Sequence, residues 1–206
     1  MLSYLILGAT FAFAAAVQPG QFQAYLISQT LAHGWRRTVP AALAPLLSDA
    51  PIICLVLLVL THVPPLFVRV LQLTGGVFLL YLAFGAYKSW RHYDQALTAP
   101  RVPATRTVLN AAVVNLLNPN PYIAWALVLG PLLLDAWRRA PVTGVIFVVA
   151  FYLTLIVSTT AIILAFAVAR SFGPRVARTL VGVSAVALAG FGVYQLWAGS
   201  TSLLLD

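Results

Sequence analysis

The sequence predicts an all-α polytopic membrane protein with six transmembrane helices, arranged as a 3+3 inverted-topology repeat. Of its 206 residues, 62% are hydrophobic and only 8% are charged, whereas soluble globular domains have about 25% charged residues. A bilayer core about 30 Å thick requires roughly 20 mostly apolar residues per helix, and the chain holds six such runs. Runs such as IICLVLLVL lack the alternation that is typical of membrane β-strands.

The apolar runs and the polar segments between them define the elements. Polar, basic or Pro-rich segments such as HGWRR (33–37) and THVPP (61–65) separate the runs. A basic, Pro-containing linker at 93–106 divides a first three-helix repeat (1–92) from a second (107–206). The predicted helices lie at about 4–31, 38–61, 66–89, 107–134, 141–169 and 177–199.

Lysine and arginine are distributed unevenly between the connections. Nine follow the first, third and fifth helices, and three lie on the other side. Cytoplasmic loops carry an excess of these residues, so we expect both termini on the non-cytoplasmic side. The net charge of +8 fits contact with anionic membrane lipids and predicts no nucleic-acid partner. The nine are Arg36, Arg37, Lys88, Arg91, Arg101, Arg106, Arg170, Arg175 and Arg178; the three are Arg69, Arg138 and Arg139.

Three sequence matches indicate an internal duplication. FGAYKSW (84–90) matches FGVYQLW (191–197), and GWRRTVP (34–40) matches AWRRAPV (136–142), at offsets of 107 and 102. VQPGQF (17–22) corresponds to LNPNPY (117–122) at an offset of 100. Because each half has an odd number of helices, the second half would enter the membrane from the opposite side. Inverted repeats of this kind are typical of secondary transporters.

Corresponding interruptions in the first and fourth helices predict a binding site. Proline removes a backbone donor and clashes with the carbonyl four residues earlier, so the freed groups require a protein-lined cavity. Substrate sites of inverted-repeat transporters lie at such broken helices. The alternative is a plain proline kink in which Gln and Asn hold helices together. The interrupting residues are Gln18, Pro19, Gly20 and Gln21 in the first helix, and Asn118, Pro119, Asn120 and Pro121 in the fourth.

Asp49 is the one acidic residue inside an apolar run, and Pro45 and Pro51 flank it. A charge at a helix centre costs about 2.5–3.5 kcal/mol on insertion scales and marks a functional position by default. Asp49 could exchange a proton or bind a substrate ammonium; the alternative is an aspartate near a helix end, hydrated by a loop. Its counterpart in the second half, at offset 102, is Phe151.

Other polar residues carry weaker predictions. Gln72 and Gln195 are interpreted as interface or packing residues near helix ends, and the Gly75-Gly76 pair predicts a close helix contact, which could form a homodimer. The single cysteine, Cys54, excludes an internal disulfide, and the three histidines fall in predicted loops without metal-ligand spacing. We therefore expect no metal and no cofactor. No catalytic motif is present, so we do not expect an enzyme.

The chain resembles the lysine-exporter/threonine-exporter (LysE/RhtB) family of amino-acid exporters over nearly its whole length. The resemblance rests on six helices in 206 residues, Pro19-Gly20 in the first helix, Asp49 in the second and Asn118-Pro119 in the fourth. The family motifs are usually P-G-P, G-D and N-P-K. This chain has Pro19-Gly20-Gln21, Ser48-Asp49 and Asn118-Pro119-Asn120, which makes it a divergent member without the lysine.

The resemblance implies a multi-pass protein of the bacterial inner membrane that exports amino acids or related small metabolites by proton antiport. The predicted site lies at broken helices 1 and 4, and protons would be coupled through Asp49. The expected partners are a small-molecule substrate and membrane lipids. The rivals are an uncoupled channel or facilitator and a non-catalytic structural or lipid-interacting membrane protein. The predicted substrate-binding residues are Gln18, Pro19, Gly20, Gln21, Asp49, Asn118, Pro119 and Asn120.

Overall fold

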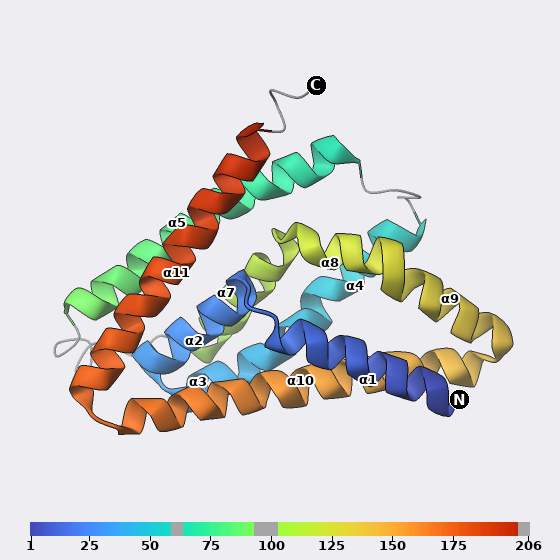
Figure 1. The fold of residues 1–206 in the computed structure, drawn as a ribbon, viewed down its shortest axis with the longest axis horizontal. Helices are drawn as coiled ribbons and strands as arrows, with labels where there is room; N and C mark the ends of the chain where they lie inside the picture. The colour runs from blue at the N-terminus through green and yellow to red at the C-terminus, as the bar shows by residue number, and fades with distance from the viewer. Residues whose placement is uncertain (59–63, 93–102, 202–206) are drawn as a thin grey trace.

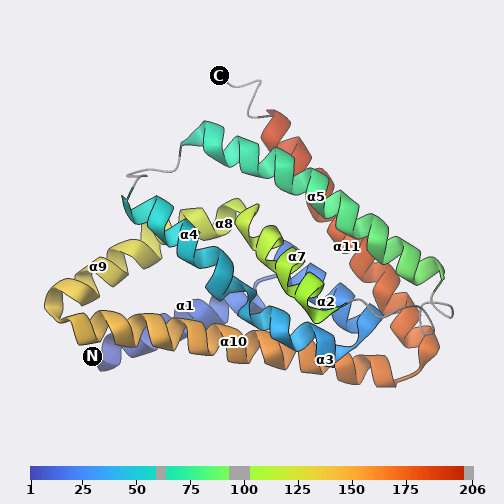
Figure 2. The same cartoon turned by 180° about the vertical axis from the view of Figure 1, so that it is seen from behind.

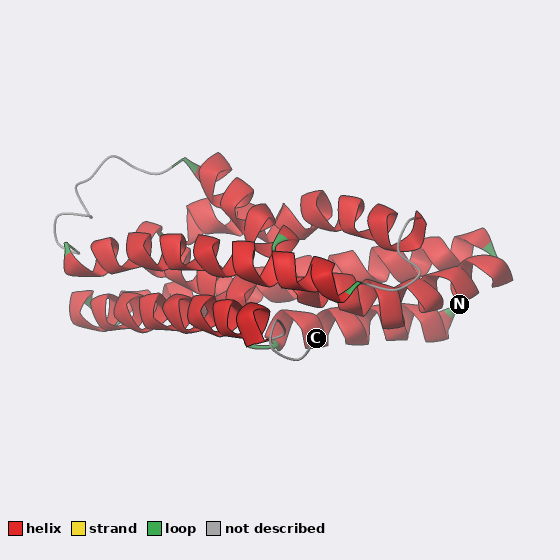
Figure 3. Cartoon of the chain, turned by 90° about the horizontal axis from the view of Figure 1, so that it is seen from above, coloured by secondary structure: helices red, strands yellow, loops and turns green. Residues whose placement is uncertain are grey.

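The computed structural model describes residues 1–58, 64–92 and 103–201, and within them all regular structure is helical (Figures 1 and 3). Every predicted helix is present, and two of them are broken. The helices of the first half are α1 (Leu2–Val17), α2 (Gln21–His33), α3 (Trp35–Thr38), the 3-10 turn η1 (Val39–Leu43), α4 (Ala44–Leu58) and α5 (Pro65–Arg91). Those of the second half are α7 (Ala104–Leu116), α8 (Pro119–Ala124), the π-helical turn η2 (Trp125–Leu129), α9 (Gly130–Arg139), α10 (Pro141–Ser171) and α11 (Pro174–Thr201).

The number of membrane spans depends on how the broken helices are counted. By length and composition, four helical segments can cross a membrane: Trp35–Val56, Pro65–Arg91, Pro141–Ser171 and Pro174–Thr201. Two further pairs of helices are long and apolar enough to cross a membrane only when each pair is taken together. These are α1 with α2, bent by 62° at the break, and α7 with α8–α9, bent by 57°. With each bent pair taken as one span, the count is six, in agreement with the sequence prediction.

Several predicted boundaries differ from the structure. The second predicted helix begins three residues early, at Trp35, and passes through the 3-10 turn, because Pro40 has no N–H for a regular helical bond. The predicted linker at 93–106 is partly helical, since α7 begins at Ala104. Its residues 93–102, and residues 59–63 of the predicted Pro-rich turn, lie outside the described residues.

Small and apolar residues spaced four apart pair the long helices. The buried positions of α1 are Tyr4, Gly8, Ala12 and Ala16, one stripe of the helix. This stripe lies along α10, and a Cβ on Gly8 would come 2.6 Å from the Phe147 carbonyl oxygen. In the same way α5 packs along α11, the diagonal pair in Figures 1 and 2. Such stripes let helix backbones approach closely where lipid offers no hydrophobic driving force.

The Gly75-Gly76 pair makes its close contact within the chain. A Cβ on Gly76 would come 2.9 Å from the Gly192 carbonyl oxygen of α11, and one on Gly75 would come 2.7 Å from the Leu117 carbonyl oxygen at the end of α7. The predicted close helix contact is therefore confirmed as an intramolecular one. The pair is not available to a second copy of the chain, so a homodimer stays a prediction without this support.

The end of α2, the end of α5 and the turn from α10 to α11, each with basic residues in or next to it, lie at one end of the molecule, the basic end, on the left in Figure 1. There α2 leads into α3 at Gly34, and α10 leads into α11 at Gly173. Both glycines have positive φ, 90° and 118°, which only glycine adopts without strain. His33 is the last residue of α2 rather than part of a loop, and Arg178 stacks over the Trp90 ring at 5.7 Å. The cytoplasmic location of this end stays a prediction.

Candidate functional site

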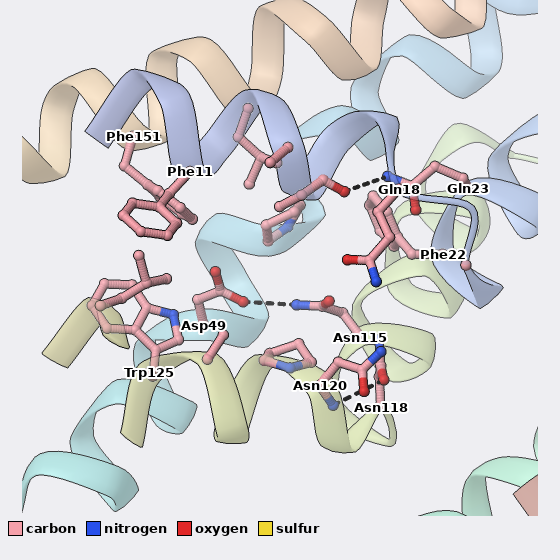
Figure 4. A pocket seen from close by; sticks show the side chains of 18 of the residues that line it. Phe11, Gln18, Phe22, Gln23, Asp49, Asn115, Asn118, Asn120, Trp125 and Phe151 are labelled. Carbon is pink, nitrogen blue, oxygen red and sulfur yellow. Dashed lines mark hydrogen bonds between the residues drawn. The ribbon is translucent and has the colours of Figure 1, made fainter. Parts of the chain in front are cut away.

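A cavity of about 360 Å³ lies where both helix breaks meet the middle of α4 and α10 (Figure 4). Its apolar walls include Phe22, from the core around α2, α5 and α11, and Trp125, from the core around α1, α4 and α10. Its polar lining consists of Gln18, Gln21, Gln23, Asp49, Asn115, Asn118 and Asn120. A largely apolar cavity with a few convergent polar groups is the usual form of a small-molecule site.

The first break leaves the beginning of α2 open toward this cavity. Gln18 donates its backbone N–H to Ala14 as the last helical bond of α1, and Gly20 is extended. No side chain caps α2, so its first backbone N–H groups have no intrahelical partner. On the other side of the break, Gln23 donates its side-chain amide to the Ala16 carbonyl at 2.9 Å. The first break thus presents free donors.

The second break satisfies most of its own backbone. Pro119 cannot donate to the Asn115 carbonyl, and the Asn118 N–H takes that place at 3.2 Å. The Asn118 side chain accepts from the Asn120 N–H at 3.1 Å, as a helix cap. Tyr122 donates its hydroxyl to the Leu116 carbonyl at 3.0 Å. The Asn-Pro-Asn-Pro sequence and the tyrosine after it therefore supply both the break and its substitutes.

Asp49 lies in the cavity wall with only 5% of its surface exposed. Asn115 of α7 donates to Asp49 Oδ1 at 2.7 Å and to Ser48 Oγ at 2.8 Å. Tyr152 of α10 donates its hydroxyl to Asp49 Oδ2 at 3.2 Å. Figure 4 shows the carboxylate between Trp125 and Asn115, across from Gln18. Two neutral donors from two other helices therefore fix the carboxylate.

No cationic side chain pairs with Asp49 in the part of the chain that the structure describes. A buried carboxylate without a counter-charge is costly in a low-dielectric interior. The other described carboxylate, Asp135, is different. It lies in the middle of α9, accepts a hydrogen bond from Tyr4, and pairs with Arg139 Nε at 3.4 Å. Asp49 can therefore accept a proton or bind a cationic ligand, whereas the charge of Asp135 is already balanced by Arg139.

The structure brings together seven of the eight predicted site residues. Gln18, Pro19 and Gly20 line the cavity from the first break, and Asn118 and Asn120 from the second. Gln21 and Asp49 complete the group. Pro119 does not line the cavity: it is buried at the first position of α8 and acts only through the backbone.

Four polar residues that the sequence prediction missed belong to the same network. Asn115 and Tyr152 hold Asp49, and Gln23 bridges the first break. Gln195 of α11, interpreted from sequence as a packing residue near a helix end, is buried and donates to Gln21 Oε1 at 2.6 Å. A usable signal existed for Tyr152, because it immediately follows Phe151, the counterpart of Asp49 under the internal repeat.

The family model of the LysE type translocators matches residues 13–199. The chain belongs to the LysE type translocator family. The matched region includes both helix breaks, Asp49 and the whole cavity lining except Phe11. As a member of this family the chain is a multi-pass membrane transport protein, and LysE type translocators are transporters rather than enzymes. No similar curated protein and no similar solved structure was found for it.

Proposed function

We propose that this LysE type translocator is a secondary active exporter of amino acids or related small metabolites, coupled to protons through Asp49. The observation that carries the proposal is the cavity itself. It places a buried carboxylate without a cationic partner opposite a helix beginning with free backbone donors. An amino acid has the complementary charges, an ammonium and a carboxylate, on one carbon atom.

The substrate carboxylate would bind at the first break. The uncapped beginning of α2 offers backbone N–H groups and the positive end of a helix dipole, which together favour an anion. The amides of Gln18 and Gln21 lie beside these groups. The substrate ammonium would then face Asp49, whose position Asn115 and Tyr152 already fix. Asn120 and the aromatic walls would contact the side chain of the substrate.

Coupling follows from competition at one carboxylate. A proton and a substrate ammonium each neutralise Asp49, and each removes the need for the other. A carboxylate that returns protonated after releasing an amino acid outside the cell moves one proton inward for each substrate exported. This mechanism is proton antiport, and it requires that Asp49 never cross the membrane interior both charged and unpaired.

The proposal includes the inverted repeat. Under the repeat, α1 corresponds to α7, α4 to α10 and α5 to α11. The contact between α1 and α10 then corresponds to the contact between α7 and α4, and the α5–α11 contact corresponds to itself. The two breaks also correspond, at an offset of 100. We place the protein in a bacterial inner membrane with the basic end of Figure 1 in the cytoplasm, as the excess of arginine there favours.

The test is transport by the purified protein in proteoliposomes with an imposed pH gradient, using radiolabelled amino acids. Wild-type protein is expected to drive an amino acid above its equilibrium distribution. Asp49→Asn keeps the size of the side chain but cannot exchange a proton, so uphill transport is expected to fall at least 100-fold. Asp135→Asn is the matched control, because it removes a described carboxylate outside the cavity, and it should retain transport within about twofold.

Two alternatives predict different results. An uncoupled channel would equilibrate the amino acid without exceeding equilibrium, even in the wild type. A structural or lipid-interacting protein would move no amino acid and would tolerate Asp49→Asn. Uphill transport by Asp49→Asn at the wild-type rate would contradict the coupling role directly.

A further inference from the structure

The side-chain amides of Gln21 and Gln195 connect the first helix break to a helix outside the cavity. Gln21 begins α2 and lines the cavity, while Gln195 lies behind it on α11. Both side chains are 6% exposed, and Gln195 Nε2 donates to Gln21 Oε1 at 2.6 Å. Because Gln21 Oε1 is turned toward Gln195 in this bond, the part of the Gln21 amide that remains for the cavity is its NH2, a hydrogen-bond donor.

The other end of the Gln195 amide lies beside the second break. Gln195 Oε1 is buried and has no hydrogen-bond partner among the described residues. A Cβ on Gly75 would lie 2.6 Å from Gln195 Oε1 and 2.7 Å from the Leu117 carbonyl oxygen, so both oxygens border the space that this glycine leaves. The Leu117 carbonyl ends α7, and its ordinary helical donor would be residue 121, which is a proline without an N–H.

In this arrangement the acceptor oxygens beside Gly75 outnumber the hydrogen-bond donors. Gln195 Oε1 is a buried acceptor without a donor, which costs free energy, and it shares the space beside Gly75 with the Leu117 carbonyl oxygen. Rotation of a side-chain amide by half a turn exchanges its oxygen and its NH2. If both amides turn, Gln21 donates to Gln195 Oε1, and the Gln195 NH2 points toward the Leu117 carbonyl. The same two side chains then satisfy the backbone of the second break.

We propose that Gln195 is a positioning residue that links the two helix breaks, and that its amide and that of Gln21 turn over together. In one arrangement Gln21 presents a donor to the cavity and the Leu117 carbonyl has no donor from Gln195. In the other, Gln21 presents its oxygen and Gln195 donates to Leu117. The two breaks, on α1–α2 and α7–α8, are thereby connected through a third helix.

The consequence for binding rests on the proposed function. A ligand carboxylate accepts hydrogen bonds only, so it selects the arrangement in which Gln21 offers NH2. A neutral carboxamide contains both a donor and an acceptor and can bind either arrangement. Gln195 therefore favours free acids over the corresponding amides without contacting the ligand itself, and binding at the first break removes a donor from the second.

The link between the amides is tested without any ligand, by thermal unfolding of the full-length protein in detergent. Gln21→Leu, Gln195→Leu and the double variant form a cycle, and Gln72→Leu on α5 controls for the loss of another glutamine amide. We expect each single variant of the pair to lower the unfolding temperature and the double variant to lower it no further than the larger single effect. Additive shifts would overturn the link.

The effect on the cavity is tested with L-lysine, L-threonine and their carboxamides as probes, by calorimetric titration. In Gln195→Met the Gln21 amide is no longer held, so the dissociation constants of the free acids should rise about tenfold while those of the carboxamides change less than twofold. Gln72→Met should change neither. An equal change for acids and carboxamides would overturn the positioning role. Failure of all probes to bind the wild type would count against the proposed function, while the unfolding cycle would still decide the link.

Discussion

The two helix breaks differ in how they treat their own backbone. The first bends the chain by 62° and leaves the beginning of α2 uncapped. The second bends it by 57°, but Asn118 caps α8 and the Tyr122 hydroxyl donates to the freed Leu116 carbonyl. The first break is thus a source of hydrogen-bond donors, and the second is a hydrogen-bonded frame that holds Asp49 through Asn115.

Under the proposed repeat and function, this difference would let one duplicated element serve two ends of a ligand. A pair of identical breaks would present two helix beginnings and would suit two anions. Here the second break is closed by its own side chains, and the acidic group beside it comes from α4. The cavity therefore carries donors at one side and an acceptor at the other, which matches a zwitterion.

The largest expected effect concerns the frame around Asp49. Asn115→Leu removes the 2.7 Å donor to the carboxylate, and hydrogen bonds to charged groups contribute about 1.5–3 kcal/mol. We expect a loss of about that size in the free energy of unfolding in detergent. In an Asp49→Asn background the same substitution should cost clearly less. Equal losses in both backgrounds would show that Asn115 supports the fold independently of Asp49.

The next effect concerns Gly75, where α5 approaches α11 and the end of α7 closely behind the second break. In Gly75→Ala the new Cβ would lie 2.6 and 2.7 Å from two oxygens, so overpacking should destabilise the protein by about 1–3 kcal/mol. Gly85→Ala, on the same helix, meets no atom within 4 Å and should be neutral or stabilise by up to about 1 kcal/mol through helix propensity. Unfolding measurements that failed to separate these variants would refute the packing of α5 against α7 and α11.

A smaller effect tests the carbonyl that Tyr122 covers. Tyr122→Phe leaves the ring in place and removes only the donor to the Leu116 carbonyl at 3.0 Å. The expected loss of unfolding free energy is about 1 kcal/mol. Tyr81→Phe, on the exposed face of α5, is the matched control and should change the stability by less than half as much.

The smallest effect is expected at the first break. Gln23→Leu removes the donor to the Ala16 carbonyl at 2.9 Å, but Gln23 lines the cavity, where water can replace its amide at little cost. The expected loss of unfolding free energy is about 0.5 kcal/mol. A loss larger than that of Tyr122→Phe would reverse the comparison, making the first break the structural frame and the second the open one.

Much of this arrangement was predictable from sequence, because membrane helices need long apolar runs and proline interrupts them at defined places. Both breaks lie at the QPGQ and NPNP segments, and Asp49 faces the cavity that these segments line. The partners of Asp49 were not predictable in the same way. Asn115 and Tyr152 come from two other helices, and their meeting depends on how α4, α7 and α10 pack around the bend.

Gln195 illustrates the same limit. Its position in α11 follows from the last apolar run, but its contact with Gln21 spans 174 residues and depends on the glycines of α5, which let α11 approach the breaks. The charge of Asp49 is a local signal that sequence reveals, whereas the role of a neutral amide depends on what lies beside it. Under the proposed repeat, the position equivalent to Asp49 is Phe151, where symmetry alone would have predicted a second carboxylate.

The proposed function requires that an amino acid occupy the cavity between the two breaks. Cys54 is the single cysteine, so Ala15→Cys in a Cys54→Ser background places one thiol in the cavity lining, and Ser200→Cys near the exposed end of α11 is the control. The measurement is the rate of labelling by a water-soluble maleimide, with and without a saturating amino acid that the protein transports. If the amino acid binds there, labelling at position 15 is expected to be slower in its presence, and the rate at position 200 is expected to stay unchanged. Equal rates at position 15 with and without the amino acid would contradict it.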